Sequence, residues 1–187
     1  LHQGITISLT GERERDEDGK PLAVDLHSDT GLKDFVTYLD GNREAIIHEV
    51  IHMNGERNGV PVEVAMTYNN SFSENLFSYV NNINTHEGGT HLTGFRRGLT
   101  NTLKKYAEGS GMLDKLKFDI SGDDFREGLT AVVSVKVAEP QFQGQTKTKL
   151  GNAEISAPVS QAVSEMLQSY LEEHPNDAKT IVQKVIL

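Results

Sequence analysis

Two strand-like runs constrain the fold of this chain more than any other feature of its sequence. In the first run, apolar side chains recur at every second position, at Val60, Val62, Val64, Met66 and Tyr68. The second run, from Thr130 to Val137, is rich in β-branched residues. A period of two and a β-branched composition both favour β-strands. Because strands with apolar faces must pack against other elements, the sequence predicts a domain built around a sheet.

The neighbouring segments show further regular patterns. The turn residues Asn69-Asn70-Ser71 separate the first run from another period-two run at 76–80, which predicts a β-hairpin. Apolar residues recur at helical spacing in four segments, 31–41, 90–107, 155–170 and 178–186. Thr90 is expected to cap the second helix, and the polar segment 140–152 is expected to form a surface loop. The fold class that follows is α+β, with helices on one side of an antiparallel-rich sheet.

The first 30 residues have the pattern of a separate hairpin. Alternating apolar residues at 5–9 and 22–26 flank a highly charged stretch at 12–20. Two strands alone are marginally stable in water, so this hairpin is expected to belong to a sheet formed mainly elsewhere. The chain also begins at Leu1 instead of Met. We therefore expect a piece of a longer chain, with one domain ending near residue 30 and a second domain at 31–187.

Charge and cysteine content exclude several classes of protein. The net charge of −9 excludes a protein whose whole surface binds nucleic acid, although a local basic patch is still allowed. The absence of cysteine excludes disulfides, thiolate metal sites and cysteine nucleophiles, and it favours a cytoplasmic location. No apolar run in the sequence approaches the roughly 18 residues that a membrane span needs.

The sharpest short motif is the HExxH pattern of His48, Glu49 and His52. On a helix, the two imidazoles would lie on one face and could bind Zn²⁺, while Glu49 activates a bound water. However, residues 46–53 suit a strand as well as a helix, and Asn54-Gly55 is expected to end this segment. A catalytic zinc also needs a third protein ligand, which the sequence does not single out. A zinc hydrolase is therefore a distant alternative, and a structural segment that happens to contain histidines is the favoured interpretation.

Two other segments carry residues suited to binding anions. Segment 86–97 combines a glycine pair with basic residues and includes the start of the helix predicted at 90–107. That helix presents four cations on its polar side: Arg96, Arg97, Lys104 and Lys105. The loop at 144–150 places Gln145, Lys147 and Lys149 at alternate positions. A lysine on an exposed loop can offer a compact charge to a terminal phosphate. Each segment alone also fits ordinary surface structure.

Taken together, three long motifs make the chain similar to a known family. They are 81–96 (NNINTHEGGTHLTGFR), 121–137 (SGDDFREGLTAVVSVKV) and 144–152 (GQTKTKLGN). The chain resembles the transducer domain of the gyrase B proteins of bacterial type IIA DNA topoisomerases. The resemblance implies that residues 31–187 fold like domain two of ribosomal protein S five, with a left-handed β-α-β crossover. It also implies that residues 1–30 are the last hairpin of a GHKL ATPase domain.

The resemblance assigns roles to individual residues. Gln145 and Lys147 match a loop that contacts the γ-phosphate of ATP held in the neighbouring ATPase domain, which gives Lys147 a catalytic role. Arg96 matches a basic residue that faces the cavity through which a DNA segment passes. Arg97, Lys104 and Lys105 extend that basic face by their positions on the same helix, where they would attract DNA phosphates.

The resemblance also implies an activity and a set of partners. The domain would couple ATP binding and hydrolysis to DNA strand passage and negative supercoiling, and it would be inactive alone. ATP and Mg²⁺ would be bound by the full-length gyrase B protein. The partners would be double-stranded DNA, the gyrase A protein and a second copy of gyrase B in an A2B2 assembly. The same domain of the topoisomerase four counterpart of gyrase B is the alternative within the family, and a plain DNA-binding module that uses the Arg96 face is another.

Overall fold

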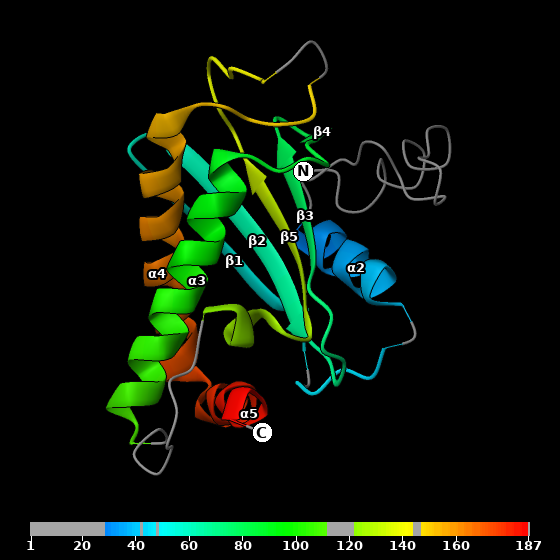
Figure 1. Ribbon diagram of the computed structural model, residues 1–187, viewed down its shortest axis with the longest axis vertical. Coiled ribbons are helices and arrows are strands. Elements are labelled where there is room, and N and C mark those ends of the chain that lie inside the picture. The colour runs from blue at the N-terminus through cyan, green and yellow to red at the C-terminus, as the bar shows by residue number, and fades with distance from the viewer. Residues whose placement is uncertain (1–28, 42, 48, 112–121, 144–146, 187) are drawn as a thin grey trace.

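The computed structural model describes residues 29–41, 43–47, 49–111, 122–143 and 147–186. These residues form one sheet with helices packed against it (Figure 1). The hairpin expected within residues 1–30 lies outside the described residues, and so does Gln145. In the described part of the chain, no helix is both long and apolar enough to span a membrane.

Within the described residues, five strands form the sheet in the order β1-β2-β5-β3-β4. Their bounds are β1 Ile51–Arg57, β2 Val60–Tyr68, β3 Asn75–Val80, β4 Ile83–Asn84 and β5 Leu129–Val135. Three neighbouring pairs are antiparallel, and β3 and β5 run parallel. The antiparallel-rich sheet predicted from the sequence is therefore confirmed, with one parallel pair in it.

The hairpin predicted between β2 and β3 is wrong, because β5 lies between these two strands. From Val64 to Tyr68, the side chains on both faces of β2 are buried, so β2 is a central strand with neighbours on both edges. β1 provides one neighbour and β5 provides the other. The segment that follows β2 is held by β5 as well, since Asn69 N–H donates to Gly128 O at 2.8 Å.

The hairpin that does form joins β1 to β2 through Asn58-Gly59. Both turn residues have positive φ values, 51° and 77°, as a two-residue hairpin of type I′ requires. The earlier pair Asn54-Gly55, expected to end this segment, lies inside β1 instead. A Cβ at Gly55 would lie 2.8 Å from the Sδ atom of Met166, so glycine allows a helix to pack closely on the strand here.

Helices cover both faces of the sheet, which corrects the expectation that they lie on one side. The described residues contain the helices α2 Asp29–Asp40, α3 Thr90–Gly109, α4 Ser156–Glu173 and α5 Pro175–Ile186. α2 packs Leu32, Phe35 and Val36 against one face, where Ala65 and Val132 point. The physical reason is that β2 and β5 place apolar side chains on both faces, with Ala65 and Val132 on the α2 side, so both faces need a cover.

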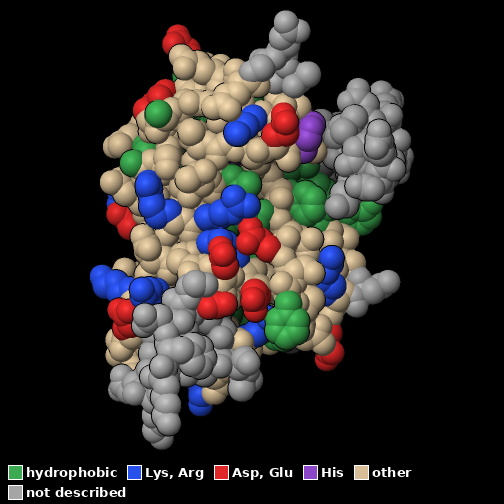
Figure 2. All heavy atoms as spheres, in the orientation of Figure 1, with side chains coloured by type: hydrophobic (Ala, Val, Ile, Leu, Met, Phe, Trp, Pro, Cys, Tyr) green, Lys and Arg blue, Asp and Glu red, His purple; other side chains and the backbone are tan. Residues whose placement is uncertain are grey.

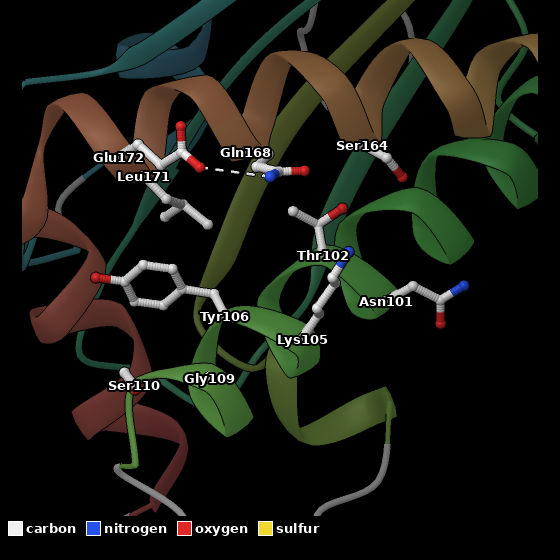
Figure 3. A pocket seen from close by; sticks show the side chains of 10 residues that line it. All are labelled: Asn101, Thr102, Lys105, Tyr106, Gly109, Ser110, Ser164, Gln168, Leu171 and Glu172. Atoms are coloured by element: carbon white, nitrogen blue, oxygen red, sulfur yellow. Dashed lines mark hydrogen bonds between the residues drawn. The ribbon is translucent and has the colours of Figure 1, made fainter.

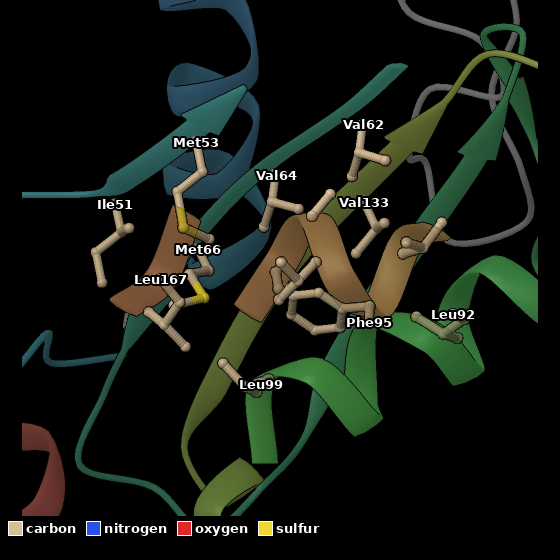
Figure 4. Close-up of a cluster of buried hydrophobic side chains, with 14 of the residues drawn as sticks. Ile51, Met53, Val62, Val64, Met66, Leu92, Phe95, Leu99, Val133 and Leu167 are labelled. Carbon is tan, nitrogen blue, oxygen red and sulfur yellow. The ribbon is translucent and has the colours of Figure 1, made fainter. Parts of the chain in front are cut away.

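The larger part of the core lies between the other face and the α3–α4 pair. Phe95 and Leu99 of α3 and Leu167 of α4 point toward Met66 and Val133 of the sheet (Figure 4). All five side chains are fully buried. This packing anchors α3 along its apolar stripe and leaves its polar side toward solvent, as its helical periodicity predicts.

Two glycines bring α3 and α4 into close contact. A Cβ at Gly94 would lie 2.4 Å from Ser156 O, and a Cβ at Gly98 would lie 2.7 Å from Ser160 O. Since both positions require the absence of a side chain, the two helices form one tightly packed unit. A short 3-10 helix, η1 Gly122–Arg126, leads into β5, and another, η2 Ala153–Ile155, leads into α4.

Candidate functional site

The loop at 140–152 is joined to the beginning of α3 by backbone hydrogen bonds. The bonds are Glu87 N–H to Thr148 O (2.9 Å), Leu150 N–H to Gly88 O (3.1 Å) and Thr90 N–H to Leu150 O (3.1 Å). The side chain of Thr148 also donates to the carboxylate of Glu87. The loop and the N-terminus of α3 therefore form a single small strip of backbone, which we call the loop–helix strip (residues 87–90 and 148–151).

The rest of the loop holds this strip from its other side. Gln143 N–H donates to Lys149 O at 2.8 Å, and Gly151 N–H donates to Gln141 O at 2.6 Å. Leu150 is the one strongly apolar residue of segment 147–151, and its side chain is fully buried. The sequence predicts this surface loop correctly, but it does not predict that the loop is anchored to α3. The isolated leucine in an otherwise polar loop was the sequence signal for that anchoring.

Lys147 comes immediately before the loop–helix strip. Its side chain is exposed, and so is that of Lys149, whereas Thr148 between them is half-buried. A cavity of about 440 Å³ lies between the loop and the first turns of α3, and Gln143, Lys149 and Arg96 are among the residues that line it. The structure thus connects the lysine-bearing loop with the basic helix, two features that lie about 50 residues apart in the sequence.

The N-terminus of α3 is held by a polar network instead of a side-chain cap. Gly89 precedes the helix, and the hydroxyl of Thr90 is buried without a hydrogen-bond partner in the described part of the chain, so the expected Thr90 cap is wrong. The backbone N–H of Thr90 is instead bonded to Leu150 O. The binding of the loop, and not local capping, therefore fixes where this helix begins.

His91, in the first turn of α3, is fully buried. Its Nε2 lies 2.9 Å from the hydroxyl of Thr85, and that hydroxyl itself donates to Ser78 O at 2.9 Å. Nε2 is thus paired with the Thr85 hydroxyl, while Nδ1 has no partner within the described residues. Burial lowers the pKa of His91 from 6.5 to about 4, because a second proton would place a positive charge in a site removed from water.

The lowered pKa of His91 predicts a loss of stability in mild acid. The unfolded chain binds the proton near pH 6.5 and the folded chain near pH 4, so His91 costs no stability above pH 6.5 and a growing amount as the pH falls toward 4. The full difference corresponds to about 3 kcal/mol. Urea unfolding of the wild type and of His91→Gln at pH 7 and pH 4.5 should show a weaker pH dependence in the variant. His86→Gln, at an exposed neighbouring position, is the control, and equal pH dependence in all three proteins would contradict the prediction.

The four basic residues expected on α3 all lie on the solvent side of that helix. Figure 2 shows Lys and Arg side chains together with acidic side chains on this face. Arg97 donates to the hydroxyls of Ser160 (3.4 Å) and Ser156 (3.3 Å). Lys104 and Lys105 are exposed. We refer to Arg96, Arg97, Lys104 and Lys105 as the basic face of α3.

A second cavity, of about 590 Å³, lies between the C-terminal halves of α3 and α4 (Figure 3). Lys105 and Tyr106 line it from α3, and Gln168 and Glu172 line it from α4, where the amide of Gln168 donates to Glu172 at 3.4 Å. Lys105 is the single member of the basic face in this lining. The cavity contains no residue of the loop–helix strip, so the two sites are separate.

The structure does not support the zinc-hydrolase interpretation. Glu49 and Val50 are not helical, and His52 lies in β1, so the helical turn that the HExxH chemistry requires is absent from these residues. His52 instead places its Nε2 2.6 Å from a carboxylate oxygen of Glu63 on β2. The described residues contain no group of three or more His, Asp and Glu side chains able to hold a metal ion. His48 lies outside the described residues.

Comparison with known proteins decides which family this site belongs to. The model of the DNA gyrase B family matches residues 31–187. The chain belongs to the DNA gyrase B family. Among its relatives, the DNA gyrase B protein of Cytophaga aurantiaca is 62% identical and that of Clostridium acetobutylicum is 46% identical, each over the whole chain. The chain spans 39% and 29% of the length of these two relatives.

Solved structures of related proteins share the fold. The 43K ATPase domain of Thermus thermophilus gyrase B, in complex with an aminocoumarin, aligns with a TM-score of 0.80 and 34% identity over 85% of this chain and 43% of that one. The topoisomerase IV ATP-binding domain of Francisella tularensis aligns with a TM-score of 0.70 and 31% identity, over 85% of this chain and 42% of that one. The mixed sheet with its helices is therefore a fold that the DNA gyrase B family shares with a topoisomerase IV protein.

Proposed function

We propose that residues 31–187 form the transducer domain of a DNA gyrase B protein, and that residues 1–30 are the end of a GHKL ATPase domain. In this role, the domain couples ATP binding and hydrolysis in its neighbour to DNA strand passage and negative supercoiling. The loop–helix strip is the observation that carries the proposal, because it joins the lysine-bearing loop to the helix with the basic face. The parallel strands β3 and β5, connected through α3, support the crossover of a fold like domain two of ribosomal protein S five.

The loop supplies the nucleotide-dependent contact in this proposal. Lys147 is exposed and directly precedes the hydrogen-bonded loop–helix strip, so its ammonium can reach a phosphate on an adjacent domain while the backbone of Thr148 and Leu150 stays bonded to the beginning of α3. We propose that Gln145 and Lys147 contact the γ-phosphate of ATP, and that Lys147 offsets the charge of the transferring group. A contact made with the triphosphate and lost with the diphosphate favours one domain arrangement over the other.

The partners follow from the same proposal. The basic face of α3 attracts backbone phosphates of double-stranded DNA, despite the net charge of −9. The complete gyrase B protein binds ATP and Mg²⁺ and works with the gyrase A protein in an A2B2 assembly in the cytoplasm, and the cysteine-free sequence suits that reducing compartment. Residues 31–187 alone are not expected to hydrolyse ATP. Identities of 46–62% with gyrase B relatives favour gyrase over topoisomerase four.

Hydrogen exchange tests whether the loop senses the γ-phosphate. In the complete gyrase B protein, amides of residues 143–150 should exchange roughly tenfold more slowly with a non-hydrolysable ATP analogue than with ADP, because a charge-assisted contact adds about 1.5 kcal/mol to the bound loop. The β1–β2 turn at 57–60 lies at the far edge of the sheet from β3 and β4 and serves as the internal control, with equal exchange in both states. Equal exchange of the loop with both nucleotides would refute the proposal.

A further inference from the structure

One carboxylate on the α3 side of the molecule has two guanidinium partners. Glu74, just before β3, places Oε1 3.1 Å from Nη2 of Arg96 on α3 and Oε2 3.0 Å from Nε of Arg126 on η1. Acidic and basic side chains accordingly lie next to each other in the middle of this face (Figure 2). Three elements thus meet at a carboxylate that uses each of its oxygens for a different arginine.

The two arginines are held to different extents. The side chain of Arg126 is 14% exposed, and it also donates to the hydroxyl of Thr100 at 3.2 Å and contacts the carboxylate of Asp123. The side chain of Arg96 is 43% exposed, and among the described residues Glu74 is the carboxylate that it contacts. Arg126 is therefore a fixed partner of Glu74, whereas Arg96 can turn toward another anion.

Arg96 also differs from the rest of the basic face. Arg97 contacts the hydroxyls of two serines, which leave its charge uncancelled. Lys104 and Lys105 are exposed to solvent. Within the described residues, Arg96 is the member of the basic face that forms an ion pair with a carboxylate. Of the charges proposed to contact DNA, the one on Arg96 is thus paired with a carboxylate in the structure.

We propose that Glu74 is an exchangeable counter-ion of Arg96, whose place is taken by a backbone phosphate when double-stranded DNA lies against α3. This inference rests on the proposed function, which directs the basic face toward DNA. An exposed ion pair is weak, and a phosphate offers a guanidinium two oxygens in matching geometry, so the exchange is favourable. Glu74 keeps Arg126 throughout, so the carboxylate retains one of its two guanidinium partners when DNA is bound.

The exchange has a measurable consequence for salt dependence. When Arg96 turns to a phosphate, the carboxylate of Glu74 loses one of its two partners and attracts a cation from solution. This uptake offsets one of the cations that DNA releases on binding. Glu74→Gln removes that charge and keeps the shape of the side chain. The variant should therefore bind a short duplex about threefold more tightly at low salt, and the slope of log K against log salt should be steeper by about one.

The experiment measures binding of a short fluorescent duplex by the complete gyrase B protein as a function of salt. Glu56→Gln, at an exposed position on β1 at the other edge of the sheet, makes the same change in net charge and should leave binding unchanged. Arg96→Ala should weaken binding. On the Arg96→Ala background, Glu74→Gln should give no further gain, because the two residues act as a pair. Glu74→Ala is a second variant without the carboxylate and should show the same gain. The melting temperatures of all variants show whether any of them is misfolded.

The outcomes distinguish a failure of the counter-ion role from a failure of the DNA contact on which it rests. If Arg96→Ala binds DNA as tightly as the wild type, both the counter-ion role of Glu74 and the proposed DNA contact of the basic face fall. If Arg96→Ala weakens binding while Glu74→Gln and Glu74→Ala do not strengthen it, the counter-ion role is wrong and the proposed function stands. A gain that persists without Arg96, or that appears equally in Glu56→Gln, also overturns the counter-ion role. Replacing chloride with inorganic phosphate at equal ionic strength should preserve the gain, and its loss would show that free phosphate, not DNA, occupies Arg96.

Discussion

Replacing Lys147 with alanine in the complete gyrase B protein is expected to abolish ATP-driven supercoiling. A hydrogen bond between an ammonium and a phosphate contributes about 1.5 to 3 kcal/mol, and in the proposed mechanism this energy is present with ATP and absent with ADP. At the upper end of this range, its loss lowers the population of the ATP-specific domain arrangement by roughly a hundredfold. The measurement is the conversion of relaxed circular DNA to its supercoiled form by the assembled enzyme with ATP.

Lys149→Ala is the matched control for this change. Lys149 has the same charge and is also exposed, two residues further along the loop, but it lines the cavity beside α3. Removing it should lower supercoiling by no more than a few fold, because the loop–helix strip uses the backbone of residue 149 and not its side chain. Full supercoiling by Lys147→Ala, or equal losses in both variants, would contradict a specific role for Lys147.

The sequence predicted the elements whose signals are local. The apolar stripes of α3 and α4 occur within single segments, and both helices form where their periodicity indicates. Pairing of strands is not local. The turn residues after β2 suit a hairpin, yet β2 pairs with β5, which begins about 60 residues later. The near-continuous apolar run of Val64–Tyr68, typical of a strand buried on both faces, was the signal against a simple hairpin and also against helices on one side.

The functional residues, like the strands, depend partly on local sequence and partly on contacts between distant segments. Motif resemblance directs attention to Lys147 and Arg96, because each lies in a recognisable segment. It does not reveal the residues that hold them, since Glu87 and Glu74 act across the fold on Thr148, Arg96 and Arg126. Such contacts depend on the packing of α3 against the loop and on the position of η1, which no single segment of the sequence specifies. The positioning of the site therefore had to come from the structure.

The position of Gly89 at the centre of the loop–helix strip leads to the second large effect. Its φ of 136° is a conformation that residues with a side chain rarely adopt. A Cβ at this position would also lie 2.4 Å from the oxygen and 2.5 Å from the nitrogen of Leu150. Gly89→Ala must therefore separate the loop from α3 or strain both, at a cost of about 3 kcal/mol or more. Even if the domain stays folded, Lys147 is displaced from its anchor, so ATP-driven supercoiling should be lost.

Gly109→Ala separates this effect from a general intolerance of α3 to alanine. Gly109 is the last residue of the same helix, and no atom lies within 4 Å of a Cβ built there, so alanine should be accepted without loss of stability. Hydrogen exchange at Leu150, whose amide is bonded to Gly88 O, should be faster in Gly89→Ala and unchanged in Gly109→Ala. A Gly89→Ala enzyme with the melting temperature and supercoiling activity of the wild type would show that the loop does not need this contact. The coupling of Lys147 to α3 would then have to run through the remaining bonds of Glu87 and Thr148.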